Sequence, residues 1–248
     1  MSIQETNLKA IADAIRAKTG ETGTIKASEF ASKIAAISTG AAEAEWVLST
    51  LPTSAAWVSV CYGDGKFVAV SYSNVSAYST DGITWTQATM PGTREWTSVC
   101  YGNGKFVAMS YDGSVSAYST DGINWTQATM PGAQNWKSVC YGNGKFVAVR
   151  YRSSVSAYST DGINWTKTTM PGGTWSWESV CYGNGKFVAV CEGIAISAYS
   201  TDGINWIKAT MPGTQKWHSV CYGDGKFVSI AINGNAVAYI KDYFNSWA

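Results

Sequence analysis

The hydrophobic positions of residues 45–241 fall into short runs of the length expected for β-strands. In the stretch that begins at Trp96, these runs cover residues 96–101, 106–111, 115–119 and 125–130. The second run is apolar almost throughout, which is typical of a strand buried on both faces. Gly, Asn, Asp and Pro separate the runs, and these are the residues that tight turns favour.

The same pattern occurs five times. The segment W-x-S-V-C-Y-G-[ND]-G-K-F-V begins at Trp57, Trp96, Trp136, Trp177 and Trp217, at steps of 39 to 41 residues. Four short strands repeated about every 40 residues predict one propeller blade per repeat. We therefore expect an all-β fold, a five-bladed β-propeller built from four-stranded repeats of about 40 residues.

Two turns are nearly invariant among the repeats. In the second repeat, Asn103-Gly104 joins the first two strands, and an Asn-Gly pair predicts a two-residue hairpin in which both residues have positive φ. The segment Ser119–Trp125 reads S-T-D-G-I-N-W, and its Asp side chain can accept hydrogen bonds from the amides of its own turn. We assign both turns to the scaffold.

Residues 45–52 suggest how the ring closes. Their sequence, E-W-V-L-S-T-L-P, matches residues 124–131, N-W-T-Q-A-T-M-P, at Trp, Thr, the large apolar position and Pro. The chain would thus enter its propeller with a fourth strand and leave it after a third, at residues 236–240. We expect the N-terminal strand to complete the last blade and close the ring.

Residues 1–40 differ from the rest. Leu8, Ile11, Ala12 and Ile15 have the spacing of one helical face, and Gly20 is a plausible end for this helix. A second short helix fits residues 28–37. We divide the chain into a helical anchor or assembly segment, 1–40, which could also mediate homo-oligomerisation, and the propeller, 41–248.

Composition narrows the functional classes. The net charge is +1 and only 14% of residues are charged, which argues against nucleic acid as a partner. No apolar stretch approaches the roughly 18 residues of a membrane-spanning helix, so no membrane insertion is expected. The sequence has no signal peptide, which predicts synthesis in the cytoplasm.

Catalytic and metal chemistry find little support. The six Cys residues form no C-x-x-C pair and there is one His, so neither a metal nor a cofactor is expected. The candidate carboxylates, Glu95, Asp112, Glu178 and Glu192, show no pairing of the kind that glycosidases use. We therefore expect no catalytic residues, and a chain that is not an enzyme.

The differences between repeats are concentrated in three places: the stretch before the repeat Trp, the residue after it, and the loop between strands two and three. In an up-and-down blade these places lie on one face, around the mouth of the ring. Either unconstrained loops have drifted there, or that face binds a ligand. The candidate ligand-binding residues are Arg94, Glu95, Thr97, Asn135, Lys137, Arg150, Arg152, Trp175, Glu178, Lys216 and His218.

Three resemblances extend this interpretation. The S-T-D-G-I-N-W turn resembles the structural Asp-box of sialidase-type propellers, with one residue fewer between Asp and Gly. The five repeats resemble five-bladed lectins of the tachylectin-2 type, which hold amino sugars between blades. Residues 8–20 and 30–34 resemble segments of tail and baseplate proteins of phages and prophages.

Together these resemblances imply a receptor-binding protein of a phage tail. It would bind cell-surface glycan through the variable face and other tail proteins through residues 1–40, and it would be located in the virion tail. Two alternatives remain open: a structural tail or baseplate protein that binds other virion proteins, and a degenerate glycosidase-like propeller.

Overall fold

The computed structural model describes residues 11–17, 22–26, 29, 46–132, 135–232 and 234–241. The chain divides into two compact units, Met1–Leu48 and Ser49–Ala248. Each unit is considered by itself below.

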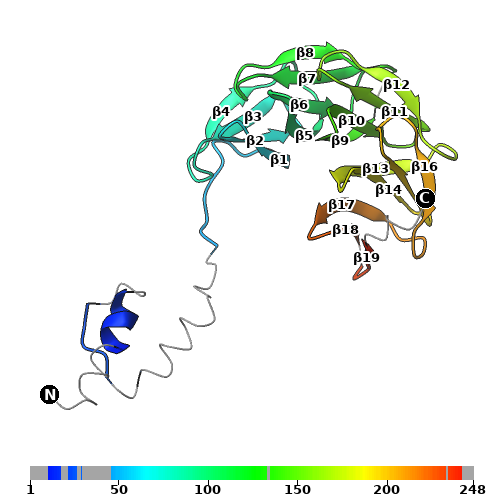
Figure 1. Cartoon of the computed structure of the whole chain (residues 1–248). Helices are drawn as coiled ribbons and strands as arrows, with labels where there is room; N and C mark the ends of the chain where they lie inside the picture. Colours follow the sequence, from blue (N-terminus) through cyan, green and yellow to red (C-terminus); the bar gives the residue numbers. More distant parts are fainter. Residues whose placement is uncertain are drawn as a thin grey trace. The chain divides into compact units, whose positions relative to one another are not determined.

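The second unit consists of five antiparallel sheets, numbered here in chain order (Figure 1). Their first strands are β1 (Trp57–Gly63), β5 (Trp96–Gly102), β9 (Trp136–Gly142), β13 (Ser176–Gly183) and β17 (Trp217–Gly223). The second strands are β2 (Lys66–Ser71), β6 (Lys105–Ser110), β10 (Lys145–Arg150), β14 (Lys186–Glu192) and β18 (Lys226–Ala231). The third strands are β3 (Val75–Ser79), β7 (Val115–Ser119), β11 (Val155–Ser159), β15 (Ile196–Ser200) and β19 (Val237–Lys241). Four sheets have a fourth strand: β4 (Thr86–Thr89), β8 (Thr126–Thr129), β12 (Thr166–Thr169) and β16 (Ile207–Thr210).

The two invariant turns have the geometry that their residues favour. Asn103 and Gly104, between β5 and β6, have φ of 46° and 71°, so the hairpin prediction is confirmed. In the turn after β7, one oxygen of Asp121 accepts the amides of Ile123 and Asn124, each at 2.8 Å. Each of these turn geometries joins consecutive strands of one sheet.

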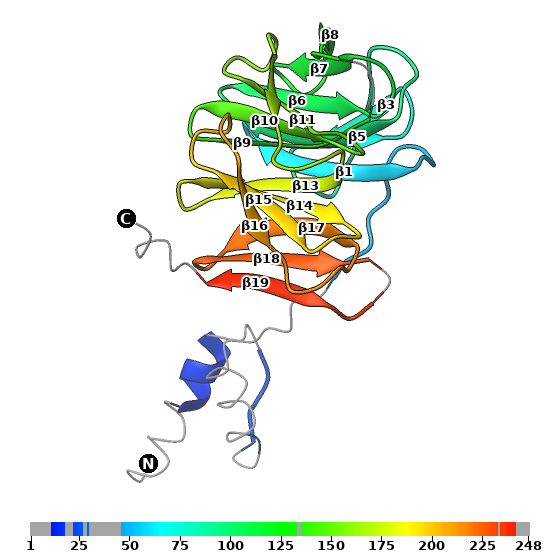
Figure 2. The ribbon, with the colours of Figure 1, turned by 90° about the vertical axis from the view of Figure 1, so that its right-hand side faces the viewer.

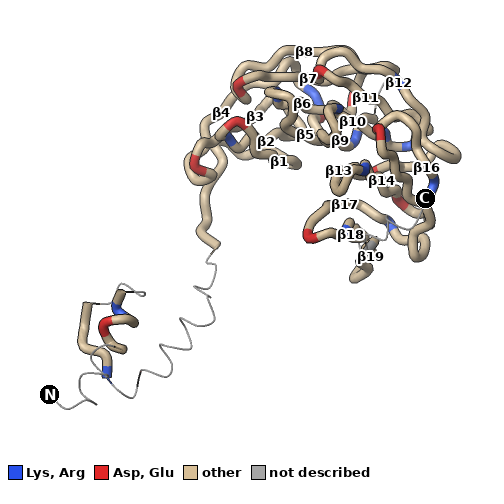
Figure 3. Tube along the Cα trace, viewed as in Figure 1, with Lys and Arg blue, Asp and Glu red and all other residues tan. Residues whose placement is uncertain are grey.

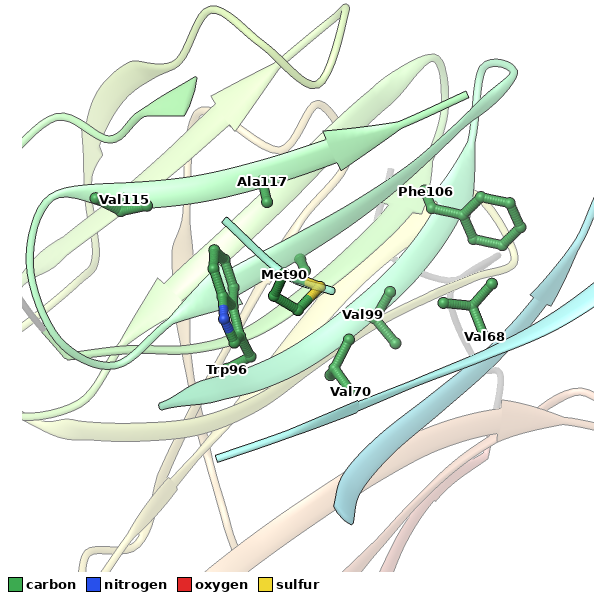
Figure 4. Close-up of a cluster of buried hydrophobic side chains, with 9 residues drawn as sticks. Val68, Val70, Met90, Trp96, Val99, Phe106, Val115 and Ala117 are labelled. Carbon is green, nitrogen blue, oxygen red and sulfur yellow. The ribbon is translucent and has the colours of Figure 1, made fainter. Parts of the chain in front are cut away.

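Neighbouring sheets pack face to face, with the first and second strands of one sheet on the first strand of the next. Figure 4 shows Val68 and Val70 of β2 facing Trp96 and Phe106 of the second sheet, and all four side chains are fully buried. The repeat residues Trp96, Trp136, Trp177 and Trp217 are likewise buried, so they belong to the core between sheets. This dry packing accounts for the apolar second strands.

The sheets follow one another along an arc that is open between the first and the last sheet (Figures 1 and 2). Among the described residues, the order β17-β18-β19 makes the last sheet three-stranded, with β19 as its outer strand. Residues 46–50 form no strand. The predicted closure of the ring by an N-terminal strand is therefore not seen. A repeat pattern specifies each sheet, but the closure depends on the angle between sheets, which the pattern does not encode.

In the first unit, residues 11–17 form a helix, as predicted, and Ala12 and Ile15 are buried with Ile25. The predicted second helix, 28–37, lies outside the described residues except for Glu29. No helix among the described residues is long and apolar enough to cross a membrane.

Candidate functional site

One cleft opens where the variable positions of the sheets converge. It has a volume of about 430 Å³ and is lined mostly by polar and aromatic side chains: Tyr72, Glu95, Thr97, Tyr111, Lys137, Tyr151, Glu178, Glu192, Lys216, Trp217, His218 and Ile232. We call it the mouth cleft. Its residues come from all five sheets, so each sheet contributes to one surface.

Hydrogen bonds between strands hold the rim of the cleft. In the first, second, third and fifth sheets, the residue after the second strand donates its amide to a carbonyl just before the first strand of the same sheet. Thus Tyr111 bonds Glu95 at 2.8 Å, Tyr151 bonds Asn135 at 2.9 Å, and Ile232 bonds Lys216 at 2.9 Å. The backbone of the rim is therefore positioned by the scaffold, while its side chains are free to differ.

A charged cluster lies on the floor of the cleft. Oε2 of Glu178 is 3.5 Å from Nζ of Lys137 and 3.5 Å from Nδ1 of His218, so this carboxylate connects the third, fourth and fifth sheets. Glu178 is buried, with only 5% of its side chain exposed, whereas His218 is about half exposed. A second ion pair joins Glu192 to Lys216 at 2.7 Å on the rim.

Burial raises the pKa of the Glu178 carboxyl above its ordinary value; Lys137 and His218 act in the opposite direction, and Glu192 adds to the rise. The hydrogen bond and the charge of Glu192 raise the pKa of Lys216. A buried carboxyl with a raised pKa beside a histidine is an arrangement that can move a proton.

Three tyrosines also line the cleft. Tyr72, Tyr111 and Tyr151 occupy the same position in the first three sheets, directly after the second strand. The rings of Tyr111 and Tyr151 are 6.3 Å apart and tilted by 46°. Glu192 and Ile232 take this position in the fourth and fifth sheets. The cleft thus combines aromatic rings with charged side chains.

The structure brings six of the predicted residues together in the mouth cleft: Glu95, Thr97, Lys137, Glu178, Lys216 and His218. Thr97 is half-buried, and its hydroxyl donates to the carbonyl of Trp136 at 2.9 Å, so it also links the second sheet to the third.

The other five predicted residues do not line this cleft. The Arg94 guanidinium donates to the carbonyl of Asp112 at 3.4 Å. Arg150 lies over the ring of Trp136 and Arg152 over that of Tyr151. Asn135 takes a turn conformation with φ of 68°, and Trp175 packs against the core between the third and fourth sheets.

Sequence reasoning missed the tyrosines, Glu192 and Ile232 as a set. A signal was present, since all five occupy one variable repeat position, at the end of the second strand or directly after it. Only knowledge of the register shows that this one loop position points into the cleft while the next ones do not.

Positively and negatively charged residues are mixed along the arc. Lys and Arg are interspersed with Asp and Glu along the arc (Figure 3). No group of three or more His, Cys, Asp or Glu side chains that could hold a metal ion occurs in the described part of the chain.

Comparison with solved structures shows the fold. No protein-family model and no curated protein matches the chain. Virginiamycin B lyase from Staphylococcus aureus is similar over 75% of this chain and 70% of its own, with a TM-score of 0.63 and 12% identity. A nidogen/laminin complex gives 0.59 at 12% identity, covering 75% of each chain. YCF48 bound to D1 peptide gives 0.60 at 18%, covering 77% of this chain and 65% of the other.

The chain therefore shares the β-propeller fold of an enzyme and of proteins that bind protein partners. These comparisons contradict the prediction that the chain is not an enzyme, because three of the similar structures are lyases, two of virginiamycin B lyase and one of streptogramin B lyase. At such identities the likeness extends to the fold alone. None of the comparisons supports the resemblances to the Asp-box family or to phage tails, and the location in a virion tail stays a prediction.

Proposed function

We propose that the mouth cleft binds a polar, ring-containing ligand of the carbohydrate class. The observation that carries this proposal is the joint lining of one cleft by tyrosines from the first three sheets and by the charged residues Glu178, His218 and Lys216. Tyrosine rings pack against the apolar face of a sugar, and charged groups accept and donate hydrogen bonds with its hydroxyls. A volume of about 430 Å³ lies within the usual range for small-molecule sites.

The rest of the mouth favours the same reading. The positions that differ between repeats lie where repeated backbone hydrogen bonds hold the chain. The fold therefore tolerates different side chains at these positions. A cell-surface glycan, the partner that the resemblance to lectin propellers implied, presents such rings repeatedly.

A glycan array followed by calorimetric titration of the strongest-binding glycan tests this proposal. We expect Glu178→Gln and Tyr111→Ala each to weaken binding by about 10-fold or more, because each removes a charged hydrogen bond or a stacking surface. The matched control is Lys167→Ala, since Lys167 is exposed on the outer strand β12, away from the cleft. Absence of binding to any glycan by folded protein, or equal binding by all three variants, would refute the proposal.

A second candidate is acid–base catalysis on the bound ligand. It is favoured by the raised pKa of the buried Glu178 carboxyl, with the imidazole of His218 at 3.5 Å. Mass spectrometry of the bound glycan after prolonged incubation tests it. Products that appear with wild type and disappear with Glu178→Gln support catalysis, and recovery of the intact glycan in both cases excludes it for that ligand.

A further inference from the structure

The two ends of the arc expose surfaces that are buried everywhere else between sheets. Val60 of β1 is 60% exposed, whereas its counterparts Val99, Val139, Val180 and Val220 are at most 6% exposed. At the other end, Ile230 of β18 is 50% exposed, whereas Val70, Met109, Val149 and Val190 are at most 1% exposed. We call these two surfaces the first end face, on β1–β4, and the last end face, on β17–β19.

Each end face carries one half of a contact that every pair of neighbouring sheets makes inside the arc. Tyr101 packs so closely on Gly63 of the preceding sheet that a Cβ there would lie 2.0 Å from its ring. Tyr141, Tyr182 and Tyr222 do the same to Gly102, Gly142 and Gly183. The halves left over are Tyr62, which is 59% exposed, and Gly223, around which nothing would lie within 4 Å of a Cβ.

A hydrogen-bond series repeats this arrangement. The amides of Val99, Val139, Val180 and Val220 donate to serine hydroxyls of the preceding sheet, at 3.1–3.2 Å. By the same repeat, the amide of Val60 would donate to a serine of a sheet before the first. The hydroxyl of Ser219 would accept from an amide of a sheet after the last. The last end face is thus complementary to the first in the same way that each sheet is complementary to the next.

The segment before the first sheet already lies where a fourth strand of a preceding sheet would lie. The hydroxyl of Thr168, in β12, donates to the carbonyl of Ile204 in the following sheet at 2.6 Å. Ser49 occupies the matching repeat position, three residues after a Trp, and its hydroxyl donates to the carbonyl of Ile83 in the first sheet. Ser49, Thr50 and Leu51 border a groove of about 370 Å³ on the first end face.

We propose that the last end face of the chain packs on its own first end face, with the segment at Ser49, Thr50 and Leu51 lying beside β19, where the other sheets have their fourth strand. The occupant of each end face is thus the other end of the same chain. Both halves are linked covalently, which gives an effective concentration that a second copy does not reach at ordinary protein concentrations. If the last end face of one copy packed on the first end face of another copy, the pair would still expose one end face of each kind. Further copies could then add, and the assembly would stay open.

The decisive experiment uses Gly223→Ala in the full chain. In a closed ring the new methyl group collides with Tyr62, so we expect the Tm to fall as it does for Gly102→Ala, the control at an internal interface. Adding Tyr62→Ala should recover most of the loss caused by Gly223→Ala. If Gly223→Ala leaves the Tm unchanged while Gly102→Ala lowers it, the end faces are not in contact and the proposal is wrong.

Two measurements on the wild-type chain make the answer independent of folding defects. Cys221 lies on the last end face and is the exposed one of the six cysteines. If the ring closes, no thiol of the native protein reacts rapidly with a thiol reagent, whereas one rapidly reacting thiol, mapped to Cys221, contradicts closure. Light scattering then assigns the partner: protection of Cys221 in a monomer supports packing within one chain, and protection only in dimers or larger species overturns it in favour of a second copy.

Discussion

At the scale of single residues, Glu178 is the buried carboxyl of the mouth cleft. Its burial raises the pKa of its carboxyl above the ordinary value of 4.5. The folded protein therefore holds this proton more tightly than the unfolded chain. By linkage, the contribution of Glu178 to stability is most favourable below its ordinary pKa and declines as the pH rises from there through the folded value.

We expect Glu178→Gln to remove this decline. The Tm of the variant relative to wild type should rise between pH 4 and the pH at which the folded carboxyl has lost its proton. Thermal unfolding followed by circular dichroism at several pH values measures it. Parallel Tm curves of the two proteins over this range would show that Glu178 is not the titrating group.

The aspartates of the repeated turns shift in the opposite direction. The amides of Thr84 and Ile83, helped by the Ser79 hydroxyl, lower the pKa of Asp81 to about 2. A group with a lowered folded pKa adds stability that is present above its ordinary pKa near 4 and is lost as the pH falls toward 2. The repeated turns should thus make the propeller acid-sensitive within this window.

A variant tests this contribution. Asp81→Asn should lower the Tm at pH 7 and make its further fall between pH 4 and pH 2 shallower than in wild type. Asp224→Asn is the control, because Asp224 is fully exposed and lies in the β17–β18 hairpin rather than in the aspartate turn. An equal acid slope in wild type and Asp81→Asn would assign the acid sensitivity to other groups.

At the scale of elements, the hairpin between first and second strands does two tasks. Asn143 has φ of 44°, which suits the tight turn between β9 and β10. Its side-chain amide also donates to the carbonyl of Thr201 in the fourth sheet at 3.2 Å, as Asn103 does to Thr160 at 3.1 Å. The same residue therefore shapes one sheet and ties it to another.

Substitutions at Asn143 separate the two tasks. Asn143→Gly keeps the positive φ and loses only the side-chain bond, so we expect a cost of about 1 kcal/mol or less. Asn143→Ala loses the bond and strains the turn, so its cost should be larger by about 1 kcal/mol. Chemical denaturation midpoints measure both, and a Gly variant less stable than the Ala variant would contradict the conformational part of this account.

The elements themselves were predictable, and the site only in part. Asn103-Gly104 and the apolar second strands specify the sheets through local geometry, which a sequence displays directly. Glu178, Lys137 and His218 could be named because they occupy one variable repeat position. Their meeting at 3.5 Å, and the grouping of Tyr111 with Tyr151, depend on the curvature of the arc, which arises from packing between sheets.

At the scale of the whole molecule, the exposed end faces conflict with the packing rule that holds elsewhere. Ile230 and Ile207 are both isoleucines in β-strands, with exposed fractions of 50% and 55%. They differ in position, because Ile230 lies on the last end face, whereas Ile207 lies on β16, the outer strand of the fourth sheet. If the ends of the chain meet, only Ile230 becomes buried.

The pair Ile230→Asp and Ile207→Asp therefore reports on the state of the whole propeller. In an open arc both aspartates remain in water, and the two variants should unfold within a few degrees of wild type. In a closed ring, Ile230→Asp places a charge in an apolar interface, which should lower the Tm by about 5–10 °C more than Ile207→Asp does. Because both variants carry the same charge on the same kind of strand, the difference between their Tm values depends on contact between the ends.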